Sequence, residues 1–257
     1  MNKLKKLSQI TFSILFWIGV WALASYRMNN SFLIPSPKSV IVSTWELLKT
    51  AEFWLIISQS LLRILLGIII AVIIGILLAV ITSKVSFINI LVTPLMSAVK
   101  ATPVASFIFI AIIFMNRNSL PVFITSLLVL PIIWTNVSAG INGVPKELKE
   151  VSEVYKFSYA KKLSKLYIPS VLPYFLAACR SALGLAWKAG VAAEVLCTPK
   201  SAIGTELYFS KTYLDTVLLF AWTLITVILS LIIEKSIIYL LSKLPYKNVS
   251  SETEVRA

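Results

Sequence analysis

Long runs of apolar residues, with few charges inside them, constrain the fold of this chain more than any other feature. The clearest run extends from Leu61 to Ile81 and contains Arg63 as its only charged residue. A helix of about 20 apolar residues is long enough to cross a bilayer. Because apolar residues follow one another instead of alternating, a transmembrane β-barrel is excluded. With 58% hydrophobic residues and a mean hydropathy of +0.88, the chain is predicted to be an all-α integral membrane protein.

Five further apolar runs bring the expected number of transmembrane helices to six. The first run is short, and its Ala22-Leu23-Ala24 segment fits either a first membrane span or a cleavable signal peptide. The tail after the last run is polar and is expected to be cytoplasmic and disordered. The further runs are Ile10 to Tyr26, Phe87 to Met115, Leu120 to Gly140, Ser170 to Leu196 and Val217 to Leu241.

The third run is interrupted by Pro94 and by Thr102-Pro103, with Lys100 between them. A broken helix at membrane depth is tolerated where it lines a cavity or is buried in protein. Two interpretations remain, a pore-lining segment and an ordinary proline kink.

The stretch between the first two runs begins with Pro35-Ser36-Pro37, where Ser36 or Ser39 can cap a helix. Val40 to Ile57 is amphipathic and is expected either to lie on the outer membrane surface or to pack on the bundle. In the second run, Gly67, Ala71 and Gly75 recur every four residues. This spacing predicts a helix face that allows close packing, while Arg63 is expected to extend toward the outer interface.

Six spans place both termini on one side of the membrane, and positive charge selects the cytoplasmic side. The richer side is therefore cytoplasmic, and the net charge of +13 needs no nucleic-acid partner to explain it. The richer side carries Lys3, Lys5, Lys6, Lys84, six loop lysines, Lys243, Lys247 and Arg256. The other side carries Arg27, Lys38, Lys49, Arg117, Lys200 and Lys211.

Several kinds of chemistry are disfavoured by composition. The chain has no histidine, which argues against haem proteins and most metalloenzymes. Cys179 and Cys197 offer neither metal-ligand spacing nor a disulfide framework. The chain also lacks the G-x-x-x-x-G-K-[ST] loop of an ATPase. We therefore expect no cofactor, no metal site and no catalytic residues.

The longest polar segment runs from Pro145 to Pro173 and is expected to form two short amphipathic helices on the cytoplasmic side. Pro145 suits the start of the first helix, and Ser158 can cap the second. Pro169 and Pro173 are expected to end the second helix.

This segment resembles the EAA loop of bacterial ABC importer permeases. Glu150 stands at the glutamate of the pattern, Val151-Ser152 at the two alanines and Lys156 at the glycine, with Leu166 and Ile168-Pro169 at I-x-L-P. Glycine usually supplies a left-handed residue there, and a lysine pays about 1 kcal/mol or more for that conformation. Either the turn differs from that of the family, or Ser158 does the capping.

The resemblance extends over most of Leu33 to Leu241 and includes FLIPSPKSV, PLMSAVKATPVASF and CRSALGLAWKAGVAAEVL. It points to the nitrate/taurine/sulfonate class and implies a type I ABC importer transmembrane domain. It also implies a second permease copy, a cytoplasmic ATPase docked on the loop and an extracytoplasmic solute-binding protein. The substrate is expected to be a small anion such as nitrate or a sulfonate, or a vitamin precursor. The expected domain boundaries are an N-terminal span with an external amphipathic segment at 1–53, the transmembrane domain at 54–242 and a cytoplasmic tail at 243–257. The coupling loop is expected at 142–169, within the transmembrane domain.

The resemblance suggests two groups of functional residues, one for ATPase docking and one for the translocation path. One residue in each group has a second interpretation. Glu150 either pairs with a basic group of the ATPase or is a solvated helix charge. Lys188 either attracts an anion in the path or is satisfied by carbonyl groups where two permeases meet. The docking candidates are Glu150, Val151, Ser152, Val154, Tyr155, Lys156, Phe157, Ser158 and Pro169. The translocation candidates are Lys188, Arg180, Glu194, Lys100, Thr102 and Pro103.

Two other classes of function are alternatives to the importer. An ion-coupled secondary transporter would build its site from broken helices, but the chain has no convincing internal repeat and the polar loop would have no role. A membrane-embedded enzyme is disfavoured by the lack of histidine and of paired carboxylates inside the spans.

Overall fold

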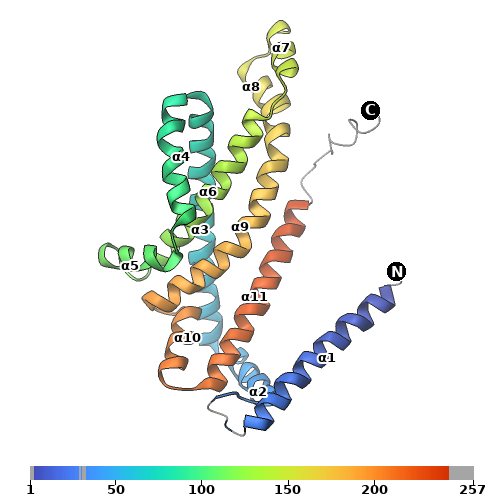
Figure 1. Ribbon diagram of the computed structural model, residues 1–257, viewed down its shortest axis with the longest axis vertical. Coiled ribbons are helices and arrows are strands. Elements are labelled where there is room, and N and C mark those ends of the chain that lie inside the picture. The colour runs from blue at the N-terminus through green and yellow to red at the C-terminus, as the bar shows by residue number, and fades with distance from the viewer. Residues whose placement is uncertain (1–2, 29, 31–32, 243–257) are drawn as a thin grey trace. The chain divides into compact units, whose positions relative to one another are not determined.

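The computed structural model describes residues 3–28, 30 and 33–242, and every regular element in these ranges is a helix. The tail expected at 243–257 lies outside the described residues. Figure 1 follows the elements along the chain. They are α1 (Lys3–Met28), α2 (Pro37–Leu48), α3 (Ala51–Lys84), α4 (Ser86–Ala101), α5 (Val104–Phe114), α6 (Leu120–Asn142), α7 (Lys146–Val154), α8 (Tyr159–Lys162), the π-helix η1 (Leu163–Tyr167), α9 (Ile168–Cys197), α10 (Ile203–Thr212) and α11 (Thr216–Ser242).

Five helical stretches of the described chain are long and apolar enough to cross a membrane, and the bent pair α4–α5 brings the number to six. The expected six-span, all-helical fold is therefore confirmed. The five are Thr11–Met28, Ala51–Lys84, Leu120–Asn142, Tyr159–Cys197 and Thr216–Tyr239. Whether the first is a retained span or a signal peptide stays a prediction.

The chain divides into two compact units. The first comprises Met1–Leu61 and Glu194–Leu229, and the second comprises Leu62–Ala193 and Ser230–Ala257.

In the second unit, α3 packs closely against α6 at two glycines of α3, Gly67 and Gly75. A Cβ atom added at Gly67 would lie 2.7 Å from the Val122 carbonyl oxygen, and one added at Gly75 would lie 2.9 Å from the Ile133 side chain. Ala71, between the two glycines, is fully buried. The predicted close-packing face of small residues is confirmed, and it faces α6.

The bend between α4 and α5 lies at Thr102-Pro103 and measures 105° (Figure 1). Thr102 has the extended backbone, with ψ 131°, that a following proline imposes. Pro94, by contrast, lies inside α4 and does not end the helix. Of the two expected interruptions, the one at Thr102-Pro103 is right and the one at Pro94 is wrong.

In the first unit, Ser36 caps α2 by accepting a hydrogen bond from the Ser39 amide, with Pro37 in the first turn. The expected single amphipathic segment from Val40 to Ile57 is wrong, because α2 ends at Leu48. Ala51 then starts the long helix α3, which also includes the second apolar run. Thr50 accounts for the new start, since its hydroxyl oxygen accepts from the Phe53 amide at 3.2 Å.

Aromatic and polar contacts hold the first unit together. The Trp21 indole donates to the Pro35 carbonyl at 3.1 Å, and Trp21 stacks on Phe220. Phe53 stacks on Trp222, whose side chain is fully buried. These contacts join α1, the start of α3 and α11.

Candidate functional site

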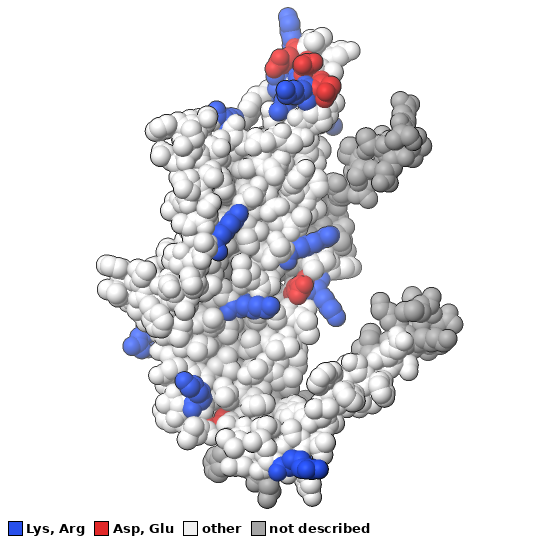
Figure 2. Space-filling view, in the orientation of Figure 1, with Lys and Arg blue, Asp and Glu red and all other residues white. Residues whose placement is uncertain are grey.

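Helix α7 and the turn that follows it form the end of the second unit where charged side chains gather (Figure 2). Glu147, Glu150 and Glu153 recur every three residues along α7 and are exposed. Val151, Val154 and Tyr155 expose 47%, 77% and 72% of their surface. Since exposed apolar and aromatic side chains of this size commonly anchor interfaces, this end of the unit has the composition of a docking surface.

Ser152 is the one docking candidate on α7 that is buried, and its hydroxyl donates to the Lys149 carbonyl at 2.7 Å. Its small side chain lies on the inner face of α7. Among the docking candidates, Ser152 therefore supports the helix instead of forming its outer surface.

The turn after α7 has the Schellman geometry, with Lys156 in the left-handed position at φ 48°. The Phe157 amide donates to the Ser152 carbonyl at 2.9 Å, and the Lys156 amide donates to the Glu153 carbonyl at 2.9 Å. Lysine thus adopts the conformation expected of the family's glycine. Ser158 also caps α8 as predicted, through its hydroxyl oxygen and the Lys161 amide at 3.4 Å.

The expectation that Pro169 and Pro173 end the second loop helix is wrong. The helical stretch continues from Tyr159 through to Cys197. A proline ring clashes with the carbonyl group four residues earlier. The chain accommodates Pro169 by widening into η1, where the Ile168 amide donates to Leu163, five residues back. The loop is therefore joined to the span α9 without an intervening break.

Of the translocation candidates, Lys100 has a defined partner. Its ammonium donates to the Thr135 hydroxyl at 2.8 Å, and this hydroxyl donates to the Pro131 carbonyl at 2.7 Å. Lys100 is the last charged residue before the bend at Thr102-Pro103. Nothing in the sequence pointed to Thr135, apart from its place four residues after Pro131.

Arg180 and Lys188 lie on an exposed face of α9, which is otherwise small or apolar. No hydrogen bond or ion pair involves either side chain within the described residues. At 1.5 Å per residue, Lys188 lies about 14 Å inside the Cys197 end of α9 and about 12 Å from Arg180. The exposed residues of this face are Tyr174, Ala177, Arg180, Ser181, Leu185, Lys188, Ala192 and Leu196.

Glu194 differs from the basic candidates because it is fully buried, in the first unit. Its Oε2 atom accepts from the Ser60 hydroxyl at 2.8 Å and from the Gly204 amide at 3.2 Å. Ser60 in turn accepts from the Ile203 amide at 2.9 Å. Glycine is required at 204, because a Cβ atom there would clash with Glu194 itself. Glu194 and Ser60 together bind the start of α10.

A family model for the inner membrane component of binding-protein-dependent transport systems matches residues 40–243. The chain belongs to this family. It is therefore a multi-pass inner-membrane permease of an ABC importer, a transport protein and not an enzyme. The match runs from Val40 in α2 to the end of α11 and includes α7, the turn after it and the basic residues of α9.

Curated relatives of this permease are described as transporters of small anions. The chain is 28% identical over 205 residues to the nitrate import permease protein NrtB of Synechococcus elongatus, covering 76% of this chain and 73% of that protein. It is 28% identical over 201 residues to the putative aliphatic sulfonates transport permease protein SsuC of Escherichia coli, covering 77% and 76%. It is 30% identical over 138 residues to the bicarbonate transport system permease protein CmpB of S. elongatus, covering 51% of this chain and about half of that protein, 49%.

Proposed function

We propose that this permease imports a small oxyanion, and that Lys100, Arg180 and Lys188 make its path attractive to negative charge. The supporting observation is a charge imbalance in the Leu62–Ala193 part of the second unit; the Ser230–Ala257 part adds Glu234, beside Lys235, on α11. From Leu62 to Ala193 the only carboxylates are the three glutamates of α7, which lie outside the spans. The three basic side chains are exposed and have no carboxylate partner on their own spans.

Placing an ammonium or guanidinium group within a membrane span costs free energy, so such groups usually serve transport. A lipid-facing surface would be covered by large apolar side chains, as on α11, where Val227, Leu231 and Ile232 expose about half of their surface. The exposed face of α9 instead carries Arg180 and Lys188 among small residues, with fewer large side chains; the small residues are Ala177, Ser181 and Ala192, and the large ones are Tyr174, Leu185 and Leu196. This composition suits a water-filled path or a contact with a second permease copy.

The rest of the transporter follows from the family and from the loop. We propose that the permease pairs with a second copy of itself, that its termini are cytoplasmic and that a separate ATPase subunit binds α7 and the following turn. A solute-binding protein would deliver the anion on the other side. In this arrangement Glu150 pairs with a basic group of the ATPase, and Val151, Val154 and Tyr155 supply apolar contact. Phe157, with the Lys161 ammonium 4.1 Å from its ring centre, stiffens the loop.

Uptake measurements test the anion path. The assembled transporter, in proteoliposomes with ATP inside and binding protein outside, would be given labelled nitrate, bicarbonate or an alkanesulfonate. Lys188→Met is expected to lower uptake at least tenfold, whereas Lys188→Arg keeps most of it. Lys211→Met, outside the spans, serves as the control. Unchanged uptake in Lys188→Met and in Arg180→Met, with normal assembly, would reject the anion path.

Co-purification tests the docking surface. An ATPase subunit should accompany the wild-type permease in mild detergent and be lost or depleted with Glu150→Arg. Lys146→Glu, which changes charge by the same amount in the opposite sense on the same helix, separates a specific pairing from a general electrostatic effect. Transport that continues after ATP depletion would instead favour an ion-coupled carrier.

A further inference from the structure

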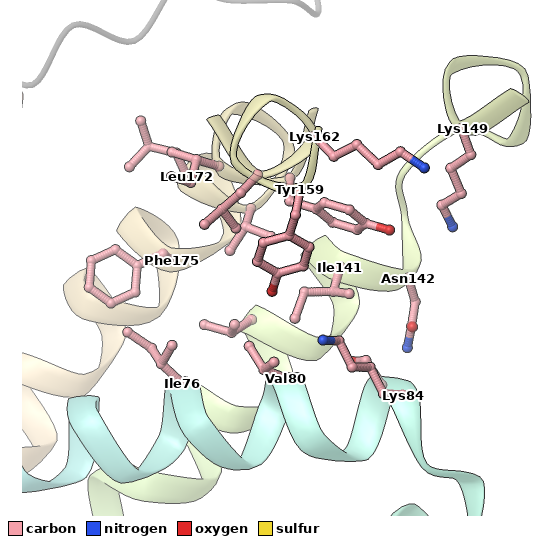
Figure 3. A pocket seen from close by; sticks show the side chains of 16 residues that line it. Ile76, Val80, Lys84, Ile141, Asn142, Lys149, Tyr159, Lys162, Leu172 and Phe175 are labelled. Carbon is pink, nitrogen blue, oxygen red and sulfur yellow. The ribbon is translucent and has the colours of Figure 1, made fainter. Parts of the chain in front are cut away.

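A cavity of about 540 Å³ lies in the second unit between the spans and the loop of α7 and α8, at the end that the proposed function makes cytoplasmic. Its walls come from α3, α6, α7, α8, η1 and α9 (Figure 3). The volume falls within the range of small-molecule sites. Nothing in the proposed transport path uses this cavity, because its lining contains none of Lys100, Arg180 and Lys188.

The lining changes from basic to apolar along the direction of the spans. Lys84 is the last residue of α3, and Val80 and Ile76 follow it on the same face, about 6 Å and 12 Å deeper. On α9, Leu172 and Phe175 extend the apolar part. Figure 3 shows these four apolar side chains on one side of the cavity, away from Lys149 and Lys162.

Three lysines, Lys84, Lys149 and Lys162, border the other part of the cavity, and no aspartate or glutamate is among the described residues that line it. On α7, Lys149 borders the cavity while the glutamates of that helix do not. The Lys84 ammonium also lies 5.5 Å from the ring centre of Tyr159, in the second half of the loop. The positive charges of these three lysines therefore border one cavity, and no carboxylate in the described part of its lining neutralises them.

We propose that this cavity binds an anionic phospholipid of the cytoplasmic leaflet. Its phosphate lies among Lys84, Lys149 and Lys162, and the first part of an acyl chain lies along Ile76, Val80 and Phe175. Basic pockets between spans on the cytoplasmic side are suited to acidic headgroups. A free inorganic anion would leave the apolar part uncovered. A zwitterionic headgroup would bring an ammonium group to a site that has no carboxylate.

The position of the site gives the lipid a role beyond filling space. Lys84 belongs to a span, whereas Lys149 and Lys162 belong to α7 and α8 of the coupling loop. One phosphate bound to all three ties the loop to α3. An occupied site therefore holds the loop in the position seen here, and the loop is more mobile when the site is empty.

Lipid binding to the full-length permease, assembled in its transporter, tests the proposal directly. Native mass spectrometry would count retained phosphatidylglycerol, and hydrogen exchange would follow α7 and α8 in nanodiscs with and without this lipid. The triple variant Lys84→Gln, Lys149→Gln and Lys162→Gln should weaken phosphatidylglycerol binding at least tenfold and should no longer show lipid-dependent protection of the loop.

Two further variants keep the test specific. The triple variant Lys146→Gln, Lys165→Gln and Lys235→Gln removes the same charge from exposed positions outside the cavity and should bind within twofold of wild type. Val80→Phe fills the apolar part with all lysines intact and should also weaken binding.

Four outcomes would overturn the proposal. They are equal phosphatidylglycerol binding by the two triple variants, equal binding of phosphatidylcholine, equal protection of the loop by inorganic phosphate alone, and protection of the cavity by the ATPase subunit in the absence of lipid. The last would assign the cavity to the protein partner. None of these readouts depends on anion transport, so the two proposals fail separately.

Discussion

Replacing Lys156 by glycine is expected to stabilise the turn of the coupling loop. Lys156 has φ 48°, which costs a residue with a Cβ atom about 1–2 kcal/mol. Glycine avoids this cost but loses about 0.5–1 kcal/mol through its greater freedom in the open state. The net gain is about 0.5–1 kcal/mol. Lys156→Ala should show little gain, because it retains the Cβ atom.

Hydrogen exchange of the Lys156 and Phe157 amides measures this gain where it arises, since both amides donate within the turn at 2.9 Å. At 1.4 kcal/mol per factor of ten, Lys156→Gly should slow their exchange about two- to fivefold. Lys156→Val should speed it, because a β-branched side chain is poorly tolerated at positive φ. Slower exchange in the valine variant, or faster exchange in the glycine variant, would refute a left-handed residue at this position.

Three further predictions concern stability in detergent, measured by thermal or denaturant unfolding. Gly67→Ala should destabilise by about 1–3 kcal/mol through overpacking, whereas Gly184→Ala, which has nothing within 4 Å of the added atom, should not. Glu194→Ala should lower the free energy of unfolding by about 2 kcal/mol or more, because it leaves the buried Ser60 hydroxyl and Gly204 amide without their shared acceptor. Unchanged stability would mean that the Glu194 carboxylate does not hold the start of α10 in place. Burial and the nearby Glu52 raise the pKa of Glu206, so the folded chain keeps a proton that the unfolded chain releases. Stability should therefore fall as pH rises above 4.5, the ordinary value, and Glu206→Gln should remove this part of the fall; an identical pH profile in the variant would contradict the assignment.

Features that depend on a few neighbouring residues could be predicted from the sequence. The bend at Thr102-Pro103 follows from the steric effect of proline on the residue before it. The caps at Ser36 and Ser158 follow from local hydrogen bonds. The turn at Lys156 was left open by the sequence, because lysine stands where the pattern has glycine, and its left-handed backbone is a finding of the structure. The spans themselves follow from length and hydropathy alone.

Features that depend on distant partners could not be predicted. The sequence groups Glu194 with Arg180 and Lys188, since all three are ionisable residues on one predicted helix. Its burial depends on Ser60, which is 134 residues away in the chain. The cavity bordered by Lys84, Lys149 and Lys162 requires α3 and the loop to meet, and hydropathy carries no information on that contact.

The continuity of the helix from Tyr159 into α9 bears on how the coupling loop can act on the spans. Had Pro169 and Pro173 ended the loop helix, a displacement of the loop would be absorbed by a flexible joint. Instead, helical hydrogen bonding continues from α8 through η1 to the face that carries Arg180 and Lys188. The one irregular turn is η1, with its wider i→i−5 hydrogen bonding, and it lies next to the cavity wall. If an ATPase binds α7 as proposed, a force applied there would cross the Lys156 turn into α8 and then follow hydrogen-bonded helix through η1 to the basic residues of α9, with compliance concentrated at these two turns.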